Sequence, residues 1–348
     1  MKIAMISTPF ESTPPLKYGG TERIVSLLTE GLAERGHEVT LFATGDSKTR
    51  ARLVYFFETA QRQMYTADDV IYHLGMAFSQ VESFDLVHNH DSFCGIPFCG
   101  LSPVPSLTTI HNSMTLSPGD KIYAAGDLRI RLFKAYPSNN YVAISENQRK
   151  AVPAGRVYRA YNAIAYQDFP FSPNKEDFFL WIGKIWPGKG LHSAIEVARR
   201  ADLKLKIAGR PHPSHLEYFQ NLMERVDGQK IQYLGEVSDE ERLDLYKRAR
   251  ALLFPIQWDE PFGLVMVEAM ACGTPVLAFG RGSVPEIIDD GRTGFVVSEV
   301  EEMVEAVKKV DSLDPRVCRK WVKEHFSAEV MIKAYEEVYQ DIMNREKR

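Results

Sequence analysis

The chain has 348 residues, of which 45% are hydrophobic and 25% are charged. This length is enough for two ordinary domains, and the composition is typical of a globular chain and excludes a disordered one. The net charge of −4 predicts no general attraction to nucleic acid, so any phosphate binding must be local.

The cysteines and the N-terminus indicate the compartment. Cys94, Cys99, Cys272 and Cys318 show no CxxC spacing, which favours a reduced protein over a disulfide framework. The opening residues MKIAMIS form a short strand pattern with neither a signal peptide nor a spanning segment. We therefore expect a cytoplasmic protein.

The first half of the chain has the pattern of a doubly wound α/β domain. An apolar strand over residues 2–7 leads through a loop at residues 8–20 into a helix with one apolar face. Residues 38–43 form the next strand, which completes a βαβ unit. Further strands are predicted at residues 52–57, 84–88, 106–110 and 141–144.

Tyr18, Gly19 and Gly20 end the loop that leads into the first helix. Adjacent glycines here let backbone amides approach a ligand phosphate or sugar, although a flexible turn explains them equally well. No GxGxxG occurs, so the dinucleotide fingerprint is absent.

Histidines follow two of the predicted strands. His88 and His90, with Asp91, suggest a metal site, but a third ligand at matching spacing is missing and we expect no metal. His111 lies just past the strand at residues 106–110, at the edge where open α/β sheets bind ligands. By position alone, His111 could equally be a structural hydrogen-bonding residue.

Residues 113–137 combine basic and apolar side chains. Such a helix could meet an acidic acceptor or a membrane surface, but we favour a solvated face over a packed one. Association with a membrane is therefore expected to be peripheral at most.

The second half begins after a Pro-rich segment at residues 169–174, which resembles a connection between domains. A strand at residues 178–183 leads to Lys184, Lys189 and a helix that starts at Leu191. Two lysines around a Pro-Gly turn at the start of a helix combine positive charge with unpaired amides. The loop is either a diphosphate receptor or simply a solvated basic loop.

Four more strands are predicted at residues 203–208, 231–234, 251–255 and 275–279, and residues 321–343 have helical periodicity. Three pairs have the spacing of a capping box: Ser145 with Gln148, Ser238 with Glu241, and Ser283 with Glu286. We therefore interpret Glu286 as a helix cap.

The stretch at residues 254–294 carries the most chemical information. A helix is expected to start at Pro261, with Gly263 in its first turn, where a ligand could approach unpaired amides. Glu260 and Glu268 enclose seven residues, which in a helix is roughly 12 Å along the axis. The pair could address two ends of one ligand, or be a cap and an ordinary helical carboxylate.

The run EPFGLVMVEAMACGTPV, followed by GSVPEII and GRTGFVV, closely resembles the nucleotide-sugar site of retaining glycosyltransferases of family 4, also called group 1. The first half contributes weaker signals, G-G-x-E and T-x-H. The resemblance implies the α/β GT-B fold, with two Rossmann-like doubly wound domains. Residues 1–165 would form the acceptor side, residues 166–327 the donor side, and residues 328–348 a helix that packs back on the first domain.

The resemblance also implies transfer of a sugar from a nucleoside diphosphate sugar, of the UDP-glucose or GDP-mannose type, to an acceptor hydroxyl with retention of configuration. Glu260 would bind a sugar hydroxyl, Glu268 the ribose hydroxyls and His111 the transferred sugar. Lys184 and Lys189 would bind the phosphates, although Lys184 stands where Arg is usual, so a point charge replaces a bidentate fork.

The remaining expected contacts come mainly from backbone. Those to the donor are Gly20, Gly183, Gly209, Arg210, Val237, Phe262, Gly263, Leu264 and Val265. Tyr18 and Gly19 would face the acceptor, which could be a sugar, a lipid-linked sugar or a small molecule. No cofactor or metal is expected, because the basic pair and the helix amides take the role of a cation and no Asp-x-Asp occurs.

Two other classes of protein are compatible with such a site. A sugar-nucleotide epimerase of similar fold would alter its substrate without any acceptor. A non-catalytic sugar-nucleotide-binding protein would bind the donor without turnover, but the presence of Glu260, Glu268, Lys189 and His111 together argues against it.

Overall fold

The computed structural model describes residues 1–16, 19–61, 66–114 and 123–346. Its internal contacts divide the chain into two compact units. The first contains the described residues up to Ala163 together with the C-terminal segment from Ala328, and the second contains Ile164–Ser327.

Within the described residues, the sheet of the first unit has seven parallel strands in the order β3-β2-β1-β4-β5-β6-β7. The strands are β1 (Lys2–Ile6), β2 (Glu38–Ala43), β3 (Arg52–Tyr55), β4 (Leu86–Asn89), β5 (Ser106–Ile110), β6 (Asn140–Ala143) and β7 (Val157–Arg159). The strand order reverses between β1 and β4, and ligands of doubly wound folds bind beside this reversal, at the carboxyl ends of the strands.

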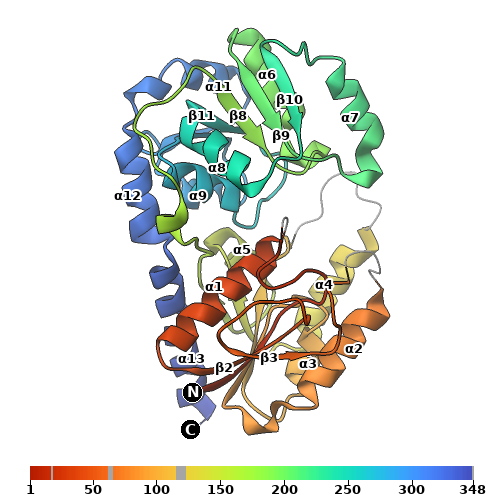
Figure 1. Ribbon diagram of the computed structural model, residues 1–348. Coiled ribbons are helices and arrows are strands. Elements are labelled where there is room, and N and C mark those ends of the chain that lie inside the picture. The colour runs from red at the N-terminus through yellow and green to blue at the C-terminus, as the bar shows by residue number, and fades with distance from the viewer. Residues whose placement is uncertain (17–18, 62–65, 115–122, 347–348) are drawn as a thin grey trace. The chain divides into compact units, whose positions relative to one another are not determined.

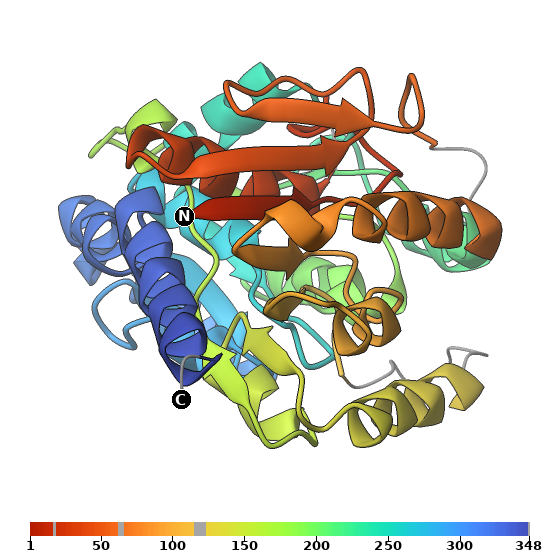
Figure 2. The ribbon, with the colours of Figure 1, turned by 90° about the horizontal axis from the view of Figure 1, so that it is seen from below.

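Helices cover both faces of this first sheet (Figures 1 and 2). Helix α1 (Gly20–Glu34) packs against α13 (Ala328–Glu346). The other face is covered by α2 (Ala67–Phe78), α3 (Ile96–Gly100) and α4 (Tyr123–Ala135). The short elements are α5 (Glu146–Ala151) and η1 (Val81–Ser83). Apolar side chains of β1, β4 and β5 are fully buried between these layers, which explains their nearly continuous hydrophobic sequences.

The second unit repeats this plan with six parallel strands among the described residues, in the order β10-β9-β8-β11-β12-β13. The strands are β8 (Phe179–Ile182), β9 (Leu205–Ala208), β10 (Ile231–Gly235), β11 (Ala251–Phe254), β12 (Val276–Phe279) and β13 (Gly294–Val297). Here the order reverses between β8 and β11, so the loops that follow these two strands lie beside each other.

Helices α6 (Leu191–Arg200), α7 (Leu216–Met223) and α11 (Val300–Val307) share an apolar core with one face of the second sheet. Helix α9 (Leu264–Ala271) contacts β11, β12, α8 (Asp239–Arg248) and α12 (Pro315–His325) on the other side (Figure 1). The remaining short helices are η2 (Tyr166–Asp168), η3 (Pro187–Lys189), η4 (Pro213–His215), α10 (Val284–Ile287) and η5 (Val310–Ser312).

The C-terminal segment differs from the prediction of one helix at residues 321–343. Helix α12 ends at His325 and α13 begins at Ala328. Between them Ser327 forms a parallel bridge with Ile164, and the Ile164 amide donates to the carbonyl of Phe326. This pairing requires extended backbone, so the helix is interrupted. Residues 169–174, expected as a connection, lie inside the second unit.

Of the three predicted capping boxes, only that of Ser238 and Glu241 forms in full; the Ser145 hydroxyl accepts from the Gln148 amide, but Gln148 Oε1 accepts from the Ile144 amide instead. The Ser238 hydroxyl accepts from the Glu241 amide, and the Glu241 carboxylate accepts from the Ser238 amide. Ser283 instead donates its hydroxyl to the carbonyl of Phe262, so the interpretation of Glu286 as its reciprocal cap is wrong.

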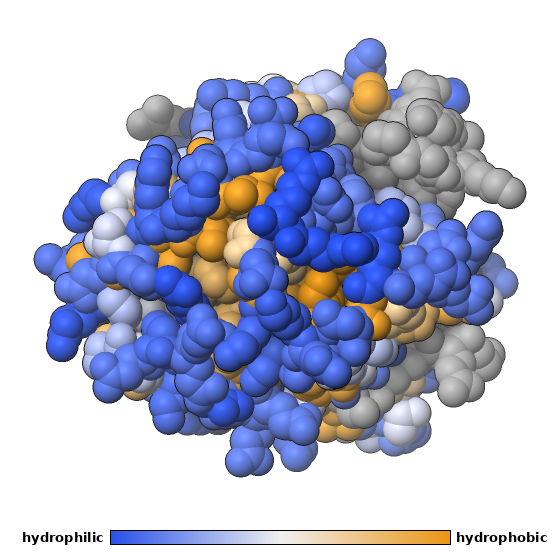
Figure 3. Space-filling view, turned by 90° about the horizontal axis from the view of Figure 1, so that it is seen from above, coloured by the Kyte–Doolittle hydropathy of each residue, from blue (hydrophilic) through white to orange (hydrophobic). Residues whose placement is uncertain are grey.

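The surface seen from above in Figure 3 is mainly hydrophilic, with apolar side chains visible in a central hollow. Among the described residues, we find no helix that combines the length and apolar character needed to cross a bilayer.

Candidate active site

Lys189 lies in the loop between β8 and α6, which is held against the chain that follows β11. Gly190 caps α6 with φ of 70°, a left-handed conformation that favours glycine, and a Cβ there would lie 1.8 Å from the carbonyl oxygen of Pro255. The Gln257 amide donates to the carbonyl of Gly188 at 2.8 Å. These contacts bring Lys189 close to the loop that carries Glu260.

Glu260 is 8% exposed, and one of its two carboxylate oxygens is already paired. Its Oε2 accepts hydrogen bonds from Lys189 Nζ at 2.5 Å and from Trp258 Nε1 at 2.9 Å. The Lys189 ammonium also lies over the Trp258 ring, 5.2 Å from its centroid. Oε1 has no partner among the described residues, so it remains able to accept from a ligand.

The backbone around Glu260 is fixed by the segment that begins α10. The Ser283 amide donates to the Glu260 carbonyl at 2.9 Å, and the Ser283 hydroxyl donates to the Phe262 carbonyl at 2.9 Å. Through these two hydrogen bonds, the GSVPE motif fixes the backbone of the loop that carries Glu260.

Helix α9 begins at Leu264, three residues later than the predicted start at Pro261. Gly263 is therefore the N-cap and not part of the first turn; its φ of 79° requires the left-handed conformation, which ends the loop and starts the helix. The amides of Leu264 and Val265 stand in the first turn, where no intrahelical acceptor exists. The start of α9 thus has the partial positive charge that favours a bound anion.

Glu268 lies in α9 and repeats the arrangement of Glu260. It is 7% exposed, and its Oε2 accepts from Arg242 Nη1 at 2.6 Å and from the Tyr246 hydroxyl at 3.1 Å. Burial and then the neighbouring Glu268 raise the pKa of Tyr246, so the phenol keeps its proton and donates. Oε1 of Glu268 has no partner among the residues that the structure describes.

The turns after β8, β9 and β10 are joined by backbone hydrogen bonds. The Gly183 amide donates to Ala208, the Gly209 amide to Gly235, and the Ile185 amide to Arg210 at 2.8 Å. Lys184 is half-buried, and burial followed by the charge of Arg210 lowers its pKa. Arg210 is exposed and Val237 is partly exposed, so both can be reached by a ligand.

In the first unit, Gly19 caps α1 and Gly20 is its first residue, while Tyr18 lies outside the described residues. Glu22, in the first turn, is buried and accepts a hydrogen bond from the Thr8 hydroxyl. Asp91 follows β4 and is buried, with no partner for Oδ2 among the described residues. Burial and then Glu22 raise its pKa to about 7.

His111 follows β5 and is partly exposed. Its Nε2 lies 2.9 Å from Nδ1 of His90, and burial lowers its pKa to about 3. Within the described ranges, no three His, Cys, Asp or Glu side chains are grouped as metal ligands. His88 and His90 instead make hydrogen bonds inside the first unit.

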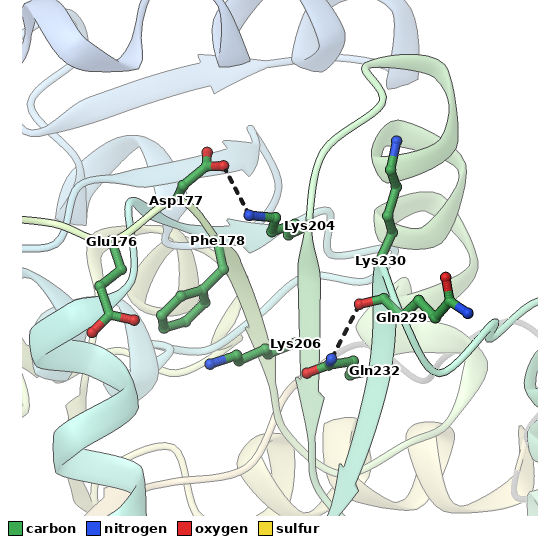
Figure 4. Close-up of a pocket in the computed structure, with 8 residues that line it drawn as sticks. All are labelled: Glu176, Asp177, Phe178, Lys204, Lys206, Gln229, Lys230 and Gln232. Atoms are coloured by element: carbon green, nitrogen blue, oxygen red, sulfur yellow. Dashed lines mark hydrogen bonds and ion pairs between the residues drawn. The ribbon is translucent and has the colours of Figure 1, made fainter.

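A hollow of about 280 Å³ lies at the end of the second sheet opposite to the start of α9, where β8, β9 and β10 begin, and Figure 4 shows the residues that line it. Its lysines already have partners: Lys204 pairs with Asp177 at 3.3 Å, Lys230 pairs with Asp202 at 2.5 Å, and Lys206 lies over the Phe178 ring. Two of its three lysines are therefore paired with carboxylates.

Sequence reasoning missed three residues that hold the glutamates: Trp258, Arg242 and Tyr246. Trp258 stands two positions before Glu260, so the sequence shows that the two residues are close, but it does not show the hydrogen bond between their side chains. Arg242 and Tyr246 lie on α8, which has no local pattern that points to Glu268; only the packing of α8 against α9 brings them together.

The architecture is shared with solved structures. Sucrose-phosphate synthase from Thermosynechococcus elongatus superposes with a TM-score of 0.79 at 19% identity, covering 99% of both chains. Anabaena HepE in complex with UDP-glucose superposes with a TM-score of 0.73 at 17% identity, covering 98% of this chain and 100% of that one. Together with the two parallel sheets, these similarities establish the GT-B fold.

The sequence comparisons define the family. The model for glycosyl transferases group 1 matches residues 165–325, and that for glycosyltransferase family 4 matches residues 18–164. A relative named as an uncharacterized glycosyltransferase, MJ1607 of Methanocaldococcus jannaschii, is 26% identical over 340 residues, covering 85% of each chain. The chain belongs to the group 1, or family 4, glycosyltransferases, as its sequence motifs predict.

Proposed function

We propose that this glycosyltransferase moves a hexose from a nucleoside diphosphate sugar, of the UDP-glucose or GDP-mannose type, to an acceptor hydroxyl with retention of anomeric configuration. The observation that most directly supports this function is the pair of buried glutamates, Glu260 and Glu268. In each, Oε2 accepts hydrogen bonds from two donors, and Oε1 is unpaired among the described residues. Carboxylates held in this way are preorganised acceptors for ligand hydroxyls.

The chemical difficulty of the reaction is the charge on the departing diphosphate. An ammonium group has three N–H donors, and Lys189 uses one of them on Glu260, which leaves two for phosphate oxygens. The amides of Leu264 and Val265 add the partial positive charge of the helix start. Lys184 would supply a second point charge, so the developing charge is stabilised without a metal ion.

We assign the remaining contacts to the unpaired oxygens. Glu260 Oε1 would accept from a hydroxyl of the transferred sugar, and Glu268 Oε1 from the ribose hydroxyls. We assign the donor to residues 166–327, where Gly183, Gly209, Arg210 and Val237 border the nucleoside, and the acceptor to the first unit, beside Gly19 and Gly20. His111 would contact the transferred sugar.

The resemblance of the fold to a protein that has been crystallised with UDP-glucose makes a uridine donor the first candidate. All four cysteines are unpaired thiols, which supports a reducing, cytoplasmic location.

A thermal-shift screen against UDP-, GDP- and ADP-sugars tests donor binding. A donor that binds only the folded protein stabilises it by about 2.7 kcal/mol at a concentration 100 times its Kd. We expect one nucleotide series to raise the melting temperature and the other two to leave it unchanged. No shift with any of them at millimolar concentration would contradict the proposal.

Product analysis tests the reaction type. With the donor identified, an α-linked donor and a panel of sugar acceptors should give an α-linked product, as read from the one-bond C1–H1 coupling in NMR. A β-linked product would exclude retention. Incubation of the donor alone separates the alternatives, since an epimerase would yield an isomeric sugar nucleotide and a binding protein would leave the donor unchanged with every acceptor.

A further inference from the structure

Three histidines lie side by side near the carboxyl ends of β4 and β5. His88 and His90 are at most 1% exposed, and their ring centroids are 3.9 Å apart. His111 is stacked beside His90, with 5.2 Å between ring centroids. Each ring can be assigned a hydrogen-bonding pattern from the atoms that surround it.

The surroundings of all three imidazoles favour the neutral form. Burial, followed by the neighbouring histidines, lowers the pKa of His88 and His90 well below the usual value, and burial lowers that of His111 to about 3. A neutral imidazole has one N–H donor and one bare nitrogen that accepts. The position of a single hydrogen therefore determines the role of each ring.

Met5 determines the position of that hydrogen on His90. Its thioether sulfur lies 3.1 Å from His90 Nε2 and can only accept. His90 Nε2 must therefore carry the hydrogen, and His90 Nδ1 is the bare nitrogen. Because His90 Nδ1 lies 2.9 Å from His111 Nε2, the hydrogen of this second contact belongs to His111.

We propose that Met5 and His90 are positioning residues that fix His111 in the Nε2–H tautomer, so that Nδ1 of His111 accepts a hydrogen bond from a hydroxyl group of the bound sugar. The role toward sugar rests on the proposed function, whereas the tautomer does not. Nδ1 of His111 has no hydrogen-bond partner among the described residues, and the residue as a whole is partly exposed. The ring thus presents an acceptor and not a donor.

The C-terminal helix supports this arrangement. His88 Nδ1 lies 2.7 Å from the Tyr339 hydroxyl, and its Nε2 lies 2.7 Å from the Thr109 hydroxyl. Thr109 in turn lies 3.1 Å from the Tyr335 hydroxyl. Tyr339 of α13 therefore holds His88 directly and Tyr335 holds it through Thr109, and because His90 packs against the His88 ring, His90 has little freedom to turn away from His111.

NMR of the full-length protein labelled with ¹⁵N-histidine tests the tautomer without any ligand. In the wild type, the His111 signal should show a protonated Nε2 and a bare Nδ1. Met5→Leu keeps the volume and removes the acceptor, a type of change that cores tolerate well. The His90 hydrogen should then move to Nδ1, and His111 should switch to the Nδ1–H tautomer. An Nδ1–H form of His111 in the wild type, or an unchanged tautomer in Met5→Leu, would overturn the proposal.

Kinetics test the role toward sugar. Met5→Leu should lower kcat/KM about tenfold, the size of one hydrogen bond that is no longer accepted. Met303→Leu is the matched control, because Met303 is equally buried but lies in the core of the second unit.

His90→Asn, which keeps an acceptor near the position of Nδ1, should restore most of the activity that His90→Leu loses. Equal rates for Met5→Leu and wild type would overturn the role toward sugar. If the protein proves inactive on every donor, only the proposed function fails, since the tautomer is measured separately.

Discussion

Replacing Lys189 with alanine tests the proposed stabilisation of the leaving group. The ammonium contacts Glu260 Oε2 at 2.5 Å, and the two side chains are 22% and 10% exposed. By analogy with the loss of one oxyanion donor, the substitution should cost about 3 kcal/mol of transition-state stabilisation, or roughly 150-fold in kcat/KM. The loss should fall mainly on kcat, because the charge on the phosphate grows as the glycosidic bond breaks.

The substitution also removes the partner of a largely buried carboxylate, so folding must be measured separately. Trp258 remains as a donor to Glu260, and we expect the variant to lose at most a few kcal/mol of the free energy of unfolding. Thermal unfolding without donor reports this loss, and release of the nucleoside diphosphate under saturating acceptor reports the rate.

Lys204→Ala is the matched control for Lys189→Ala. Lys204 is 60% exposed and lies just before β9, at the opposite end of the sheet, where it pairs with Asp177. The control should keep the wild-type rate. A folded Lys189→Ala variant with kcat/KM within about twofold of the wild type would refute the role of the lysine in leaving-group stabilisation.

Three other outcomes are expected. Trp258→Phe removes one of the two donors to Glu260 Oε2, so kcat/KM should fall about tenfold with the Kd for the free nucleotide unchanged; loss of nucleotide affinity would contradict the assignment of Glu260 to the sugar. EDTA should leave the transfer rate unchanged, and a loss of activity that manganese restores would show that a cation is needed. The pKa of Asp91 is about 7 in the folded chain, against an ordinary value of 3.8 for the unfolded chain. The contribution of the protonated Asp91 to the free energy of unfolding is therefore complete below about pH 4 and is lost as the pH rises to 7. Asp91→Asn, which cannot ionise, should therefore be more stable than the wild type at about pH 8, and identical pH profiles of thermal unfolding would contradict this.

Most of the fold could be predicted from the sequence because both sheets are parallel and buried on both faces. Such strands are short apolar runs, and the strands at residues 38–43 and 106–110 have the predicted bounds. Strands β7 and β13 were not predicted, since β7 has three residues, β13 has four, and neither is buried along its whole length.

The break between α12 and α13 could not be predicted from periodicity. The apolar positions of the two helices suggest one continuous segment, and only the pairing of Ser327 with Ile164 interrupts it. That contact joins residues far apart in the chain, so no local pattern indicates it.

In the site, too, residues that belong to local sequence patterns could be predicted, and contacts between residues far apart in the chain could not. Lys189, Glu260 and Gly263 were candidates from local sequence patterns, whereas the strand order that places β8 beside β11 and brings their loops together is known from the structure. The start of α9 was placed three residues too early because Pro261 is a common first helical residue, whereas the left-handed Gly263 delays the helix to Leu264.

The groups that orient the site residues come from other elements and were not predictable. The donors to Glu268 lie on α8, and the atom that sets the tautomer of His90 lies on β1. Hydrogen bonds between side chains on separate elements depend on packing angles that no spacing in the sequence encodes.

The most direct test of the account is a crystal structure with the intact nucleotide sugar bound. We expect the diphosphate within hydrogen-bonding distance of Lys189 Nζ and the amides of Leu264 and Val265, with a sugar hydroxyl donating to Glu260 Oε1. A diphosphate bound away from α9, for example against the lysines at the other end of the second sheet, would contradict the central claim.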